Sequence, residues 1–181
     1  AIRHFKAQGG VNITASHNPR EYNGYKAYWD DGAQVLAPHD KGIINQVNQV
    51  KIEDVLFKGN KNLIEIIGED VDKAYLNMVK TVCIDPDVIK RQHNLCIVYT
   101  PLHGAGRVII PRSLQEWGFT NVHCVKEQMV KDGNFPTVDR PNPEIAEALT
   151  LGLRDAKALD ADILMASDPD ADRVGMACKD S

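Results

Sequence analysis

Long apolar runs are missing from this sequence, and none approaches the roughly 20 residues that a membrane-spanning helix needs. Basic tracts are missing as well, because Lys and Arg are scattered and the net charge is −4, which disfavours binding to nucleic acid. The first residues contain no apolar segment typical of a signal peptide. These absences predict a cytoplasmic protein without nucleic-acid or membrane partners. A local cationic pocket could still bind a small anionic substrate.

Cysteine is scarce, and no two cysteines are close in the sequence. The absence of a Cys-x-x-Cys motif argues against a zinc site. Two of the cysteines stand in apolar, strand-like segments and are expected to be buried thiols, which agrees with a reducing, cytoplasmic setting. The four are Cys83, Cys96, Cys124 and Cys178, of which Cys96 and Cys124 are the two expected to be buried.

The hydrophobic share of 43% and the charged share of 25% are ordinary for a globular protein, and the pattern changes near residue 70. We therefore expect two parts, residues 1–70 and residues 71–181. Both ends of the chain read as cut, since it begins without Met inside what looks like the end of a helix. The elements expected in the first part are a helix end at 1–8 capped by Gly9 or Gly10, a strand at 11–14, a polar loop at 15–24, a hairpin at 25–36 turning at Asp30-Asp31-Gly32, and a helix opened by Pro38.

The second part alternates strands with helices after an opening helix. The expected elements are helices at 70–82, 107–117 and 142–158, the last with Asn142 as N-cap and Pro143 at its first position, and strands at 95–99, 122–125, 163–166 and 174–178. This alternation predicts an α/β fold with a mostly parallel or mixed sheet and helices on both faces. Ligands collect at the carboxyl ends of strands in such sheets, which draws attention to the loops at 100–106 and 167–173.

Three carboxylates at alternate positions follow one of these strands: Asp168, Asp170 and Asp172. Carboxylates that converge on one point repel each other unless a cation lies between them, and all-oxygen ligands suit Mg²⁺, Mn²⁺ or Ca²⁺. An EF-hand is excluded, because its glycine and glutamate positions hold Arg173 and Lys179. An aspartyl-phosphate phosphatase and a solvated acidic turn remain alternatives. Arg173 favours the metal interpretation, since it could provide a second clamp for a phosphate.

Ser16 and His17 follow a short strand in the first part, which makes Ser16 a candidate nucleophile. The side chains of adjacent residues are expected to point apart, and no Gly-x-Ser-x-Gly elbow is present. A turn built from Ser, Asn and Pro is the competing interpretation. Lys26, in an otherwise apolar strand, either faces solvent or transfers protons in a closed pocket. The segment from His103 to Gly106 fits no phosphate-binding fingerprint and is interpreted as a close-packed strand-to-helix turn.

Taken together, these motifs resemble the α-D-phosphohexomutases, and most closely the phosphoglucomutase branch that includes phosphopentomutase-like enzymes. The resemblance runs in order along the whole chain. The stretches that carry it are Thr14-Ala15-Ser16-His17-Asn18-Pro19, Asn23-Gly24-Tyr25-Lys26, Tyr28-Trp29-Asp30-Asp31-Gly32-Ala33-Gln34, Phe135-Pro136-Thr137-Val138 and Asp168-Pro169-Asp170-Ala171-Asp172-Arg173.

The resemblance implies a four-domain mutase that interconverts hexose 1-phosphate and hexose 6-phosphate, with the sugar most consistent with glucose. It implies that Ser16 carries the phosphate, that Mg²⁺ is held by Ser16 and the three aspartates, and that glucose 1,6-bisphosphate is the activator or intermediate. It makes Arg173 a phosphate contact and assigns proton transfer to His17 and Lys26.

The resemblance further implies that residues 1–70 are the later part of domain I and residues 71–181 most of domain II. Segments that contact the sugar and its distal phosphate would then be absent, so we expect the chain alone to have little or no mutase activity. A non-catalytic Mg²⁺- or phosphate-binding module is the alternative from another class, and a phosphatase would place its phosphate on Asp168.

Overall fold

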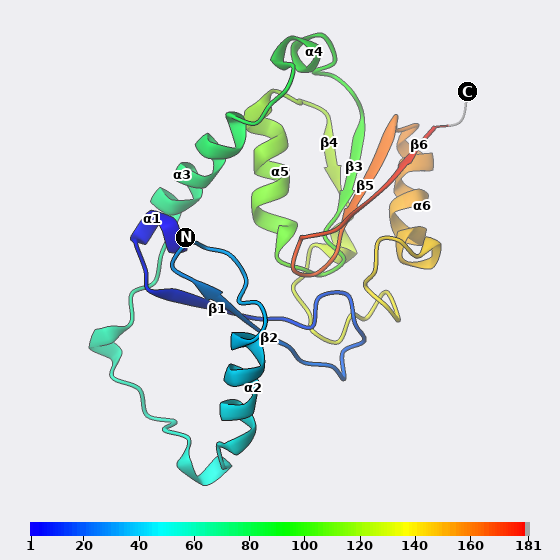
Figure 1. Cartoon of the computed structure of the whole chain (residues 1–181). Helices are drawn as coiled ribbons and strands as arrows, with labels where there is room; N and C mark the ends of the chain where they lie inside the picture. The colour runs from blue at the N-terminus through cyan, green and yellow to red at the C-terminus, as the bar shows by residue number, and fades with distance from the viewer. Residues whose placement is uncertain (180–181) are drawn as a thin grey trace. The chain divides into compact units, whose positions relative to one another are not determined.

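The computed structural model describes residues 1–179, whose contacts divide the chain into two compact units (Figure 1). The first unit comprises residues 1–14 and 24–71. The second comprises residues 15–23 together with the chain from residue 72 onward, so the loop around Ser16 groups with the second unit. Within residues 1–179, every helix is too short or too polar to cross a bilayer.

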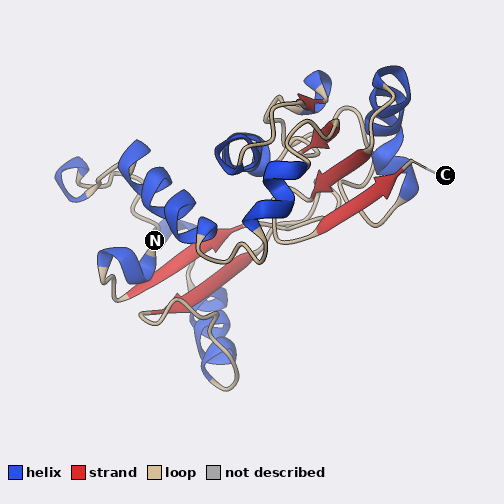
Figure 2. Ribbon diagram, turned by 90° about the horizontal axis from the view of Figure 1, so that it is seen from above, coloured by secondary structure: helices blue, strands red, loops and turns tan. Residues whose placement is uncertain are grey.

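The first unit is built on two antiparallel strands, β1 (Gly9–Ile13) and β2 (Tyr25–Trp29) (Figure 2). The predicted glycine cap of the first helix is wrong. Helix α1 (Ile2–Phe5) ends earlier, at Lys6, which adopts the left-handed conformation and donates its N–H to the last helical carbonyls. Gly9 and Gly10 instead begin β1, where Gly9 lies opposite Trp29.

The rest of the first unit is only partly regular. The turn at residues 30–32 is confirmed, with Gly32 at φ 83°, but the returning segment makes a single bridge between Tyr28 and Gln34 and forms no full strand. Helix α2 (His39–Gln49) begins directly after Pro38, as predicted, and none of its residues is buried. Two short 3₁₀ helices follow, η1 (Ile52–Asp54) and η2 (Lys61–Leu63).

The second unit contains a four-stranded sheet in the order β4-β3-β5-β6. Its strands are β3 (Ile97–Thr100), β4 (Val122–Cys124), β5 (Ile163–Ser167) and β6 (Val174–Cys178). Strand β3 runs parallel to β4 and β5, whereas β6 is antiparallel to β5. The reversal follows from the short loop between β5 and β6, because a parallel neighbour needs a crossover of about a dozen residues or more. The predicted mixed, mostly parallel sheet is thus confirmed.

Helices α5 (Gly106–Trp117) and α6 (Thr150–Leu159) cover opposite faces of this sheet, as Figure 1 shows. Gly106 of α5 lies against Tyr99 and Ser167, while Gly152 of α6 lies against Leu164. Successive residues of a strand point to opposite faces, so these contacts place the two helices on the two sides. The core on the α6 side centres on Val98, Val125, Ala161 and Leu164.

Two further helices precede the sheet, α3 (Glu69–Lys80) and α4 (Pro86–Arg91). Helix α3 was expected at 70–82 and is confirmed. Leu76 is its one fully buried residue among those described, whereas Tyr75 and Met78 are each 50% exposed.

The predicted start of the helix at Asn142 is wrong. The chain first makes a turn in which the Asn142 side chain accepts the Glu144 N–H, and the regular elements begin only at η4 (Ala146–Leu149) and continue as α6. The physical reason is the anchoring of the preceding segment, because Pro141 and Pro143 are both fully buried and the Pro143 carbonyl lies directly against Gly175 of β6.

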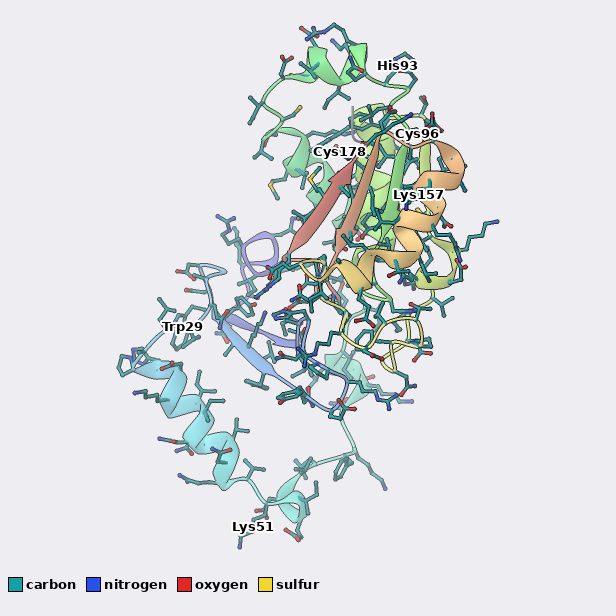
Figure 3. The ribbon with its side chains drawn as sticks, turned by 90° about the vertical axis from the view of Figure 1, so that its right-hand side faces the viewer. Trp29, Lys51, His93, Cys96, Lys157 and Cys178 are labelled. Carbon is teal, nitrogen blue, oxygen red and sulfur yellow. The ribbon has the colours of Figure 1, made fainter. Side chains whose placement is uncertain are left out.

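All four cysteines are free thiols. Cys96 and Cys124, predicted to be buried, are only half-buried, though burial still raises the pKa of both thiols. Figure 3 shows Cys96 and Cys178 at one end of the sheet, the end at which β5 begins and β6 finishes. The aspartate loop lies at the other end of β5.

Candidate metal and phosphate site

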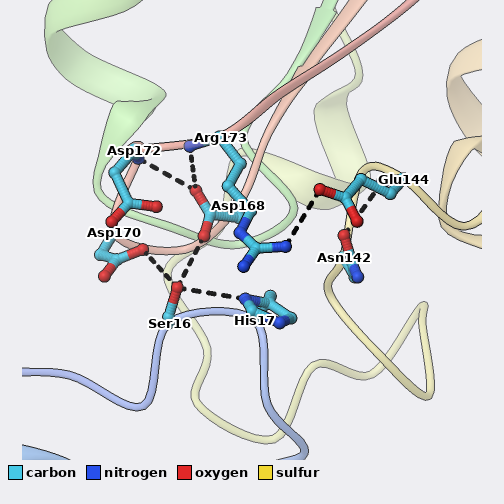
Figure 4. A network of polar contacts seen from close by, with 8 residues as sticks. All are labelled: Ser16, His17, Asn142, Glu144, Asp168, Asp170, Asp172 and Arg173. Atoms are coloured by element: carbon cyan, nitrogen blue, oxygen red, sulfur yellow. Dashed lines mark hydrogen bonds and ion pairs between the residues drawn. The ribbon is translucent and has the colours of Figure 1, made fainter.

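The structure brings Ser16 into contact with the aspartate loop (Figure 4). The Ser16 hydroxyl oxygen lies 2.9 Å from Oδ2 of Asp168 and 3.0 Å from Oδ1 of Asp170. These residues are 152 and 154 positions apart in the sequence, yet all belong to the second unit. The structure thus joins two segments that lie far apart in the sequence and that the resemblance assigns to one metal site.

Asp168 is the buried centre of this site, with no exposed surface. Its Oδ1 accepts the backbone N–H groups of Asp172 and Arg173, each at 3.0 Å, and its Oδ2 accepts the Ser16 hydroxyl. Burial raises the pKa of the Asp168 carboxyl, the backbone N–H of Arg173 opposes this, and the nearby Asp170 carboxylate raises it further. The fold thus holds an ionisable group where its negative charge is poorly solvated.

A cation would relieve this arrangement. Asp168, Asp170 and Asp172 each offer one oxygen, and these oxygens lie within 4.8 Å of one another. Asp168 is buried, Asp170 half-buried and Asp172 exposed, so the cluster opens toward solvent on one side. Oxygen donors of this kind fit a hard divalent cation such as Mg²⁺, which keeps open positions for water or a phosphate oxygen.

Ser16 adopts an uncommon backbone conformation, with φ 54°. Positive φ is disfavoured for residues with a side chain, and such strain concentrates at functional sites. The prediction that the Ser16 and His17 side chains point apart is wrong, because this turn brings Oγ within 3.2 Å of Nδ1 of His17. Since the hydroxyl donates to carboxylates, the contact is satisfied when His17 Nδ1 carries the proton and donates to Oγ.

Arg173 contributes to the site through both its backbone and its side chain. Its N–H binds Asp168, while its Nη1 lies 3.0 Å from Oε1 of Glu144. Glu144 was not among the residues expected at the site, and Asn142 was expected only as a helix cap. The one sequence signal at this position was the Pro-Asn-Pro-Glu stretch itself, which reads locally as a helix start.

The loop after β3 packs directly against the aspartate loop. Gly104 is buried against the backbone of Pro169, and the Ala105 N–H donates to the Pro169 carbonyl oxygen at 2.8 Å. The interpretation of the segment from His103 to Gly106 as a close-packed turn is confirmed. Its role is to position the aspartate loop, because a side chain at residue 104 would displace Pro169.

A buried network of hydrogen bonds, which no sequence pattern indicated, holds this supporting loop. The Thr100 hydroxyl donates to Gln128 Oε1, Gln128 Nε2 donates to the Thr137 hydroxyl, and that hydroxyl lies 2.9 Å from Nε2 of His103. His103 Nδ1 lies 2.8 Å from the carbonyl oxygen of Val130, which can only accept. His103 therefore carries its proton on Nδ1 and accepts from Thr137 on Nε2. Each of the four side chains in this network has a hydrogen-bond partner.

Lys26 lies in β2 of the first unit, half-buried and opposite Asn12 in the strand pairing. Its part in proton transfer stays a prediction.

Comparison with known proteins assigns the chain to a family. A model described as phosphoglucomutase/phosphomannomutase alpha/beta/alpha domain II matches residues 73–181, and the corresponding domain I model matches residues 1–53. A solved structure described as a putative phosphomannomutase from Thermus thermophilus superposes with a TM-score of 0.77 at 27% identity, covering 98% of this chain and 38% of that one.

Curated relatives agree with these matches. A protein named "Probable phosphomannomutase" from Haemophilus influenzae is 35% identical over 100% of this chain and 37% of its own length. A phosphoribomutase of Saccharomyces cerevisiae is 39% identical over 99% of this chain and 31% of its own, and a human phosphopentomutase is 36% identical over 98% and 30%. The chain spans about a third of the length of these relatives. It belongs to the phosphoglucomutase/phosphomannomutase family.

Proposed function

We propose that the chain carries the phosphoryl-transfer site of a sugar-phosphate mutase and that Ser16 is the residue that carries the phosphate. The observation that supports this most directly is the contact of the Ser16 hydroxyl with two members of the acidic cluster. A serine beside bare carboxylates is a poor phosphate carrier, because a phosphoserine adds a charge of about −2. With a divalent cation in the cluster, the same position becomes favourable.

The residues that would hold Mg²⁺ are Asp168, Asp170 and Asp172, with an oxygen of phosphorylated Ser16 as a further ligand. When bound, Mg²⁺ would neutralise phosphate charge as it develops during transfer. Phosphoryl transfer depends on positioning and positive charge more than on a strong nucleophile. This fits Ser16, whose hydroxyl is surrounded by the acidic cluster and by His17, which in the arrangement described above donates to the serine oxygen.

The proposed reaction moves one phosphoryl group out and another back. The bond between Ser16 Oγ and phosphorus breaks as a sugar hydroxyl of the monophosphate bonds to phosphorus, which yields a sugar bisphosphate such as glucose 1,6-bisphosphate. The bisphosphate then returns its other phosphate to Ser16. We propose that Arg173 contacts the phosphate, that the proton of the sugar hydroxyl passes to Lys26 in its uncharged form, and that His17 supplies the proton that the serine oxygen takes up as the bond breaks.

Space for a ligand exists beside Ser16. A cavity of about 330 Å³ is lined by His17, Tyr22, Arg140 and Asn142 among others, all in the second unit. This volume lies at the lower end of the range for small-molecule sites. Because the chain spans only about a third of its relatives, we propose that further segments complete the sugar site and that the chain alone turns over little substrate or none.

Intact mass spectrometry tests the proposal. After incubation with glucose 1,6-bisphosphate and Mg²⁺, the 181-residue chain should gain one phosphoryl group on Ser16, and the Ser16→Ala variant should gain none. If neither this chain nor a longer protein containing it is labelled, the phosphate-carrier role of Ser16 is refuted. A label on Asp168 would indicate a phosphatase, although both oxygens of that carboxylate already accept hydrogen bonds, which disfavours it as a nucleophile.

A further inference from the structure

The ion pair between Arg173 and Glu144 stands at the edge of the proposed phosphate site. The Arg173 side chain is 39% exposed and that of Glu144 is 63% exposed. Exposed pairs of this kind add little to folding stability. This ion pair therefore contributes little to stability, and its location at the edge of the site points to an effect on the orientation of Arg173.

Glu144 is held firmly at its backbone despite its exposed side chain. Its N–H donates to the Asn142 side chain at 3.0 Å, and the following N–H, of Ile145, donates to the Asn142 carbonyl oxygen at 3.0 Å. The preceding residue, Pro143, is fully buried with its carbonyl against Gly175. The carboxylate thus projects from a fixed turn.

Arg173 is anchored just as closely to the same place. It lies two residues before Gly175, so the contact of Pro143 with Gly175 sets Glu144 and Arg173 beside each other. Its own N–H donates to Asp168, which ties the start of its side chain to the acidic cluster. The two ends of the arginine are therefore held by two different carboxylates, one buried and one exposed.

The guanidinium keeps most of its donors for another partner. Of its five N–H groups, the described part of the chain shows only Nη1 in a hydrogen bond, to Glu144. Figure 4 shows the guanidinium in the gap between Asp168 and Glu144, above His17. A long arginine side chain samples many rotamers when free, and a planar fork binds a phosphate well in only a few of them.

We propose that Glu144 is a positioning residue: it binds Nη1 of Arg173 and so holds the remaining N–H groups toward the phosphate on Ser16. The proposal rests on the phosphate-carrier role proposed above. It predicts that loss of the Glu144 carboxylate slows phosphorylation of Ser16 without affecting the fold.

The test compares the rate at which Ser16 is labelled by glucose 1,6-bisphosphate in four proteins, followed by intact mass. Glu144→Ala should slow labelling roughly tenfold, the scale of a misoriented contact, and Glu144→Gln, which keeps an acceptor oxygen, should lie between it and the wild type. Glu127→Gln is the matched control, because Glu127 pairs with Arg154 at 2.8 Å with 46% and 50% exposure, outside the site. It should label at the wild-type rate.

A double-mutant cycle shows whether Glu144 acts through Arg173. In an Arg173→Ala background, labelling is slow and Glu144→Ala should slow it no further, since the group it positions is gone. The positioning role is overturned if Glu144→Ala slows labelling in the Arg173→Ala background by the same factor as in the wild type. It is also overturned if Glu144→Ala is labelled as fast as Glu127→Gln, or faster. Each of these results would leave Ser16 as the phosphate carrier. An unlabelled wild type would instead overturn the proposed function, and this inference with it.

Discussion

Gly104 leaves no room for a methyl group, and a side chain there should disrupt the site. A Cβ on residue 104 would lie 2.6 Å from the Pro169 carbonyl oxygen and 2.8 Å from its carbonyl carbon, and closer still to its Cα. All three are backbone atoms between Asp168 and Asp170, so no side chain can rotate away. Gly104→Ala therefore has to push the supporting loop and the aspartate loop apart.

The size of the effect follows from the contacts that are lost. Overpacking against backbone costs about 1–3 kcal/mol. Separation of the loops also lengthens the bond from the Ala105 N–H to the Pro169 oxygen, which adds about 1 kcal/mol. We expect Gly104→Ala to lower the free energy of unfolding of the second unit by about 3 kcal/mol. Because Mg²⁺ demands near-ideal octahedral geometry, its affinity should fall by roughly tenfold or more.

Urea unfolding followed by Trp117 fluorescence measures the first quantity, and calorimetric titration with Mg²⁺ measures the second. Trp29 belongs to the first unit, so a Trp29→Phe background isolates the signal of the second. Gly133→Ala is the control, because a Cβ there would meet no described atom within 4 Å. It should leave both quantities unchanged.

A Gly104→Ala protein that unfolds within about 0.5 kcal/mol of the wild type, the usual range of a neutral surface change, would refute this reasoning. So would unchanged Mg²⁺ binding in a protein that is clearly destabilised. The first result would mean that the two loops separate at no cost, and the second that their contact does not shape the carboxylate cluster.

Two further predictions concern the titration and charge of groups around β5. Burial raises the pKa of the Tyr99 hydroxyl to about 12. Its contribution to the free energy of unfolding is therefore complete below pH 10, where the unfolded chain is also neutral, and is lost as the pH rises from 10 to 12. In urea unfolding, the free energy of unfolding of the wild type should fall by about 3 kcal/mol more over that interval than that of Tyr99→Phe. At pH 7 the same variant should cost about 1 kcal/mol, through loss of the 2.7 Å bond to Ser167, and equal pH slopes would contradict the assignment. Asp170→Asn should raise the free energy of unfolding of the metal-free protein, because it removes the carboxylate that raises the pKa of Asp168, yet weaken Mg²⁺ binding about tenfold in calorimetry. A variant that gains both stability and Mg²⁺ affinity, or loses both, would contradict the idea that the carboxylates repel each other and are brought together to bind a cation.

Most regular elements could be predicted from local patterns. The apolar strands β3, β5 and β6 and the helices α3 and α5 stand where periodicity placed them, and the mixed sheet follows from their order. The errors arose where a distant contact overrode a local preference. Asn142 and Pro143 form a good helix start by themselves, but the packing of Pro143 against Gly175 keeps them in a turn and delays the helix.

The sequence by itself predicted that the three aspartates after β5 can converge on one point, because they stand at alternate positions in a short loop, and the structure brings their oxygens within 4.8 Å of one another. Local patterns did not predict the other contacts of the site, and only the family resemblance placed Ser16 with the aspartates. The contact with Ser16 spans 152 positions, the left-handed backbone of Ser16 turns its hydroxyl toward both His17 and the aspartates, and Glu144 meets Arg173 only because Pro143 packs on β6. These are long-range contacts of single side chains, which local propensity does not encode and which only the packing of the second unit decides.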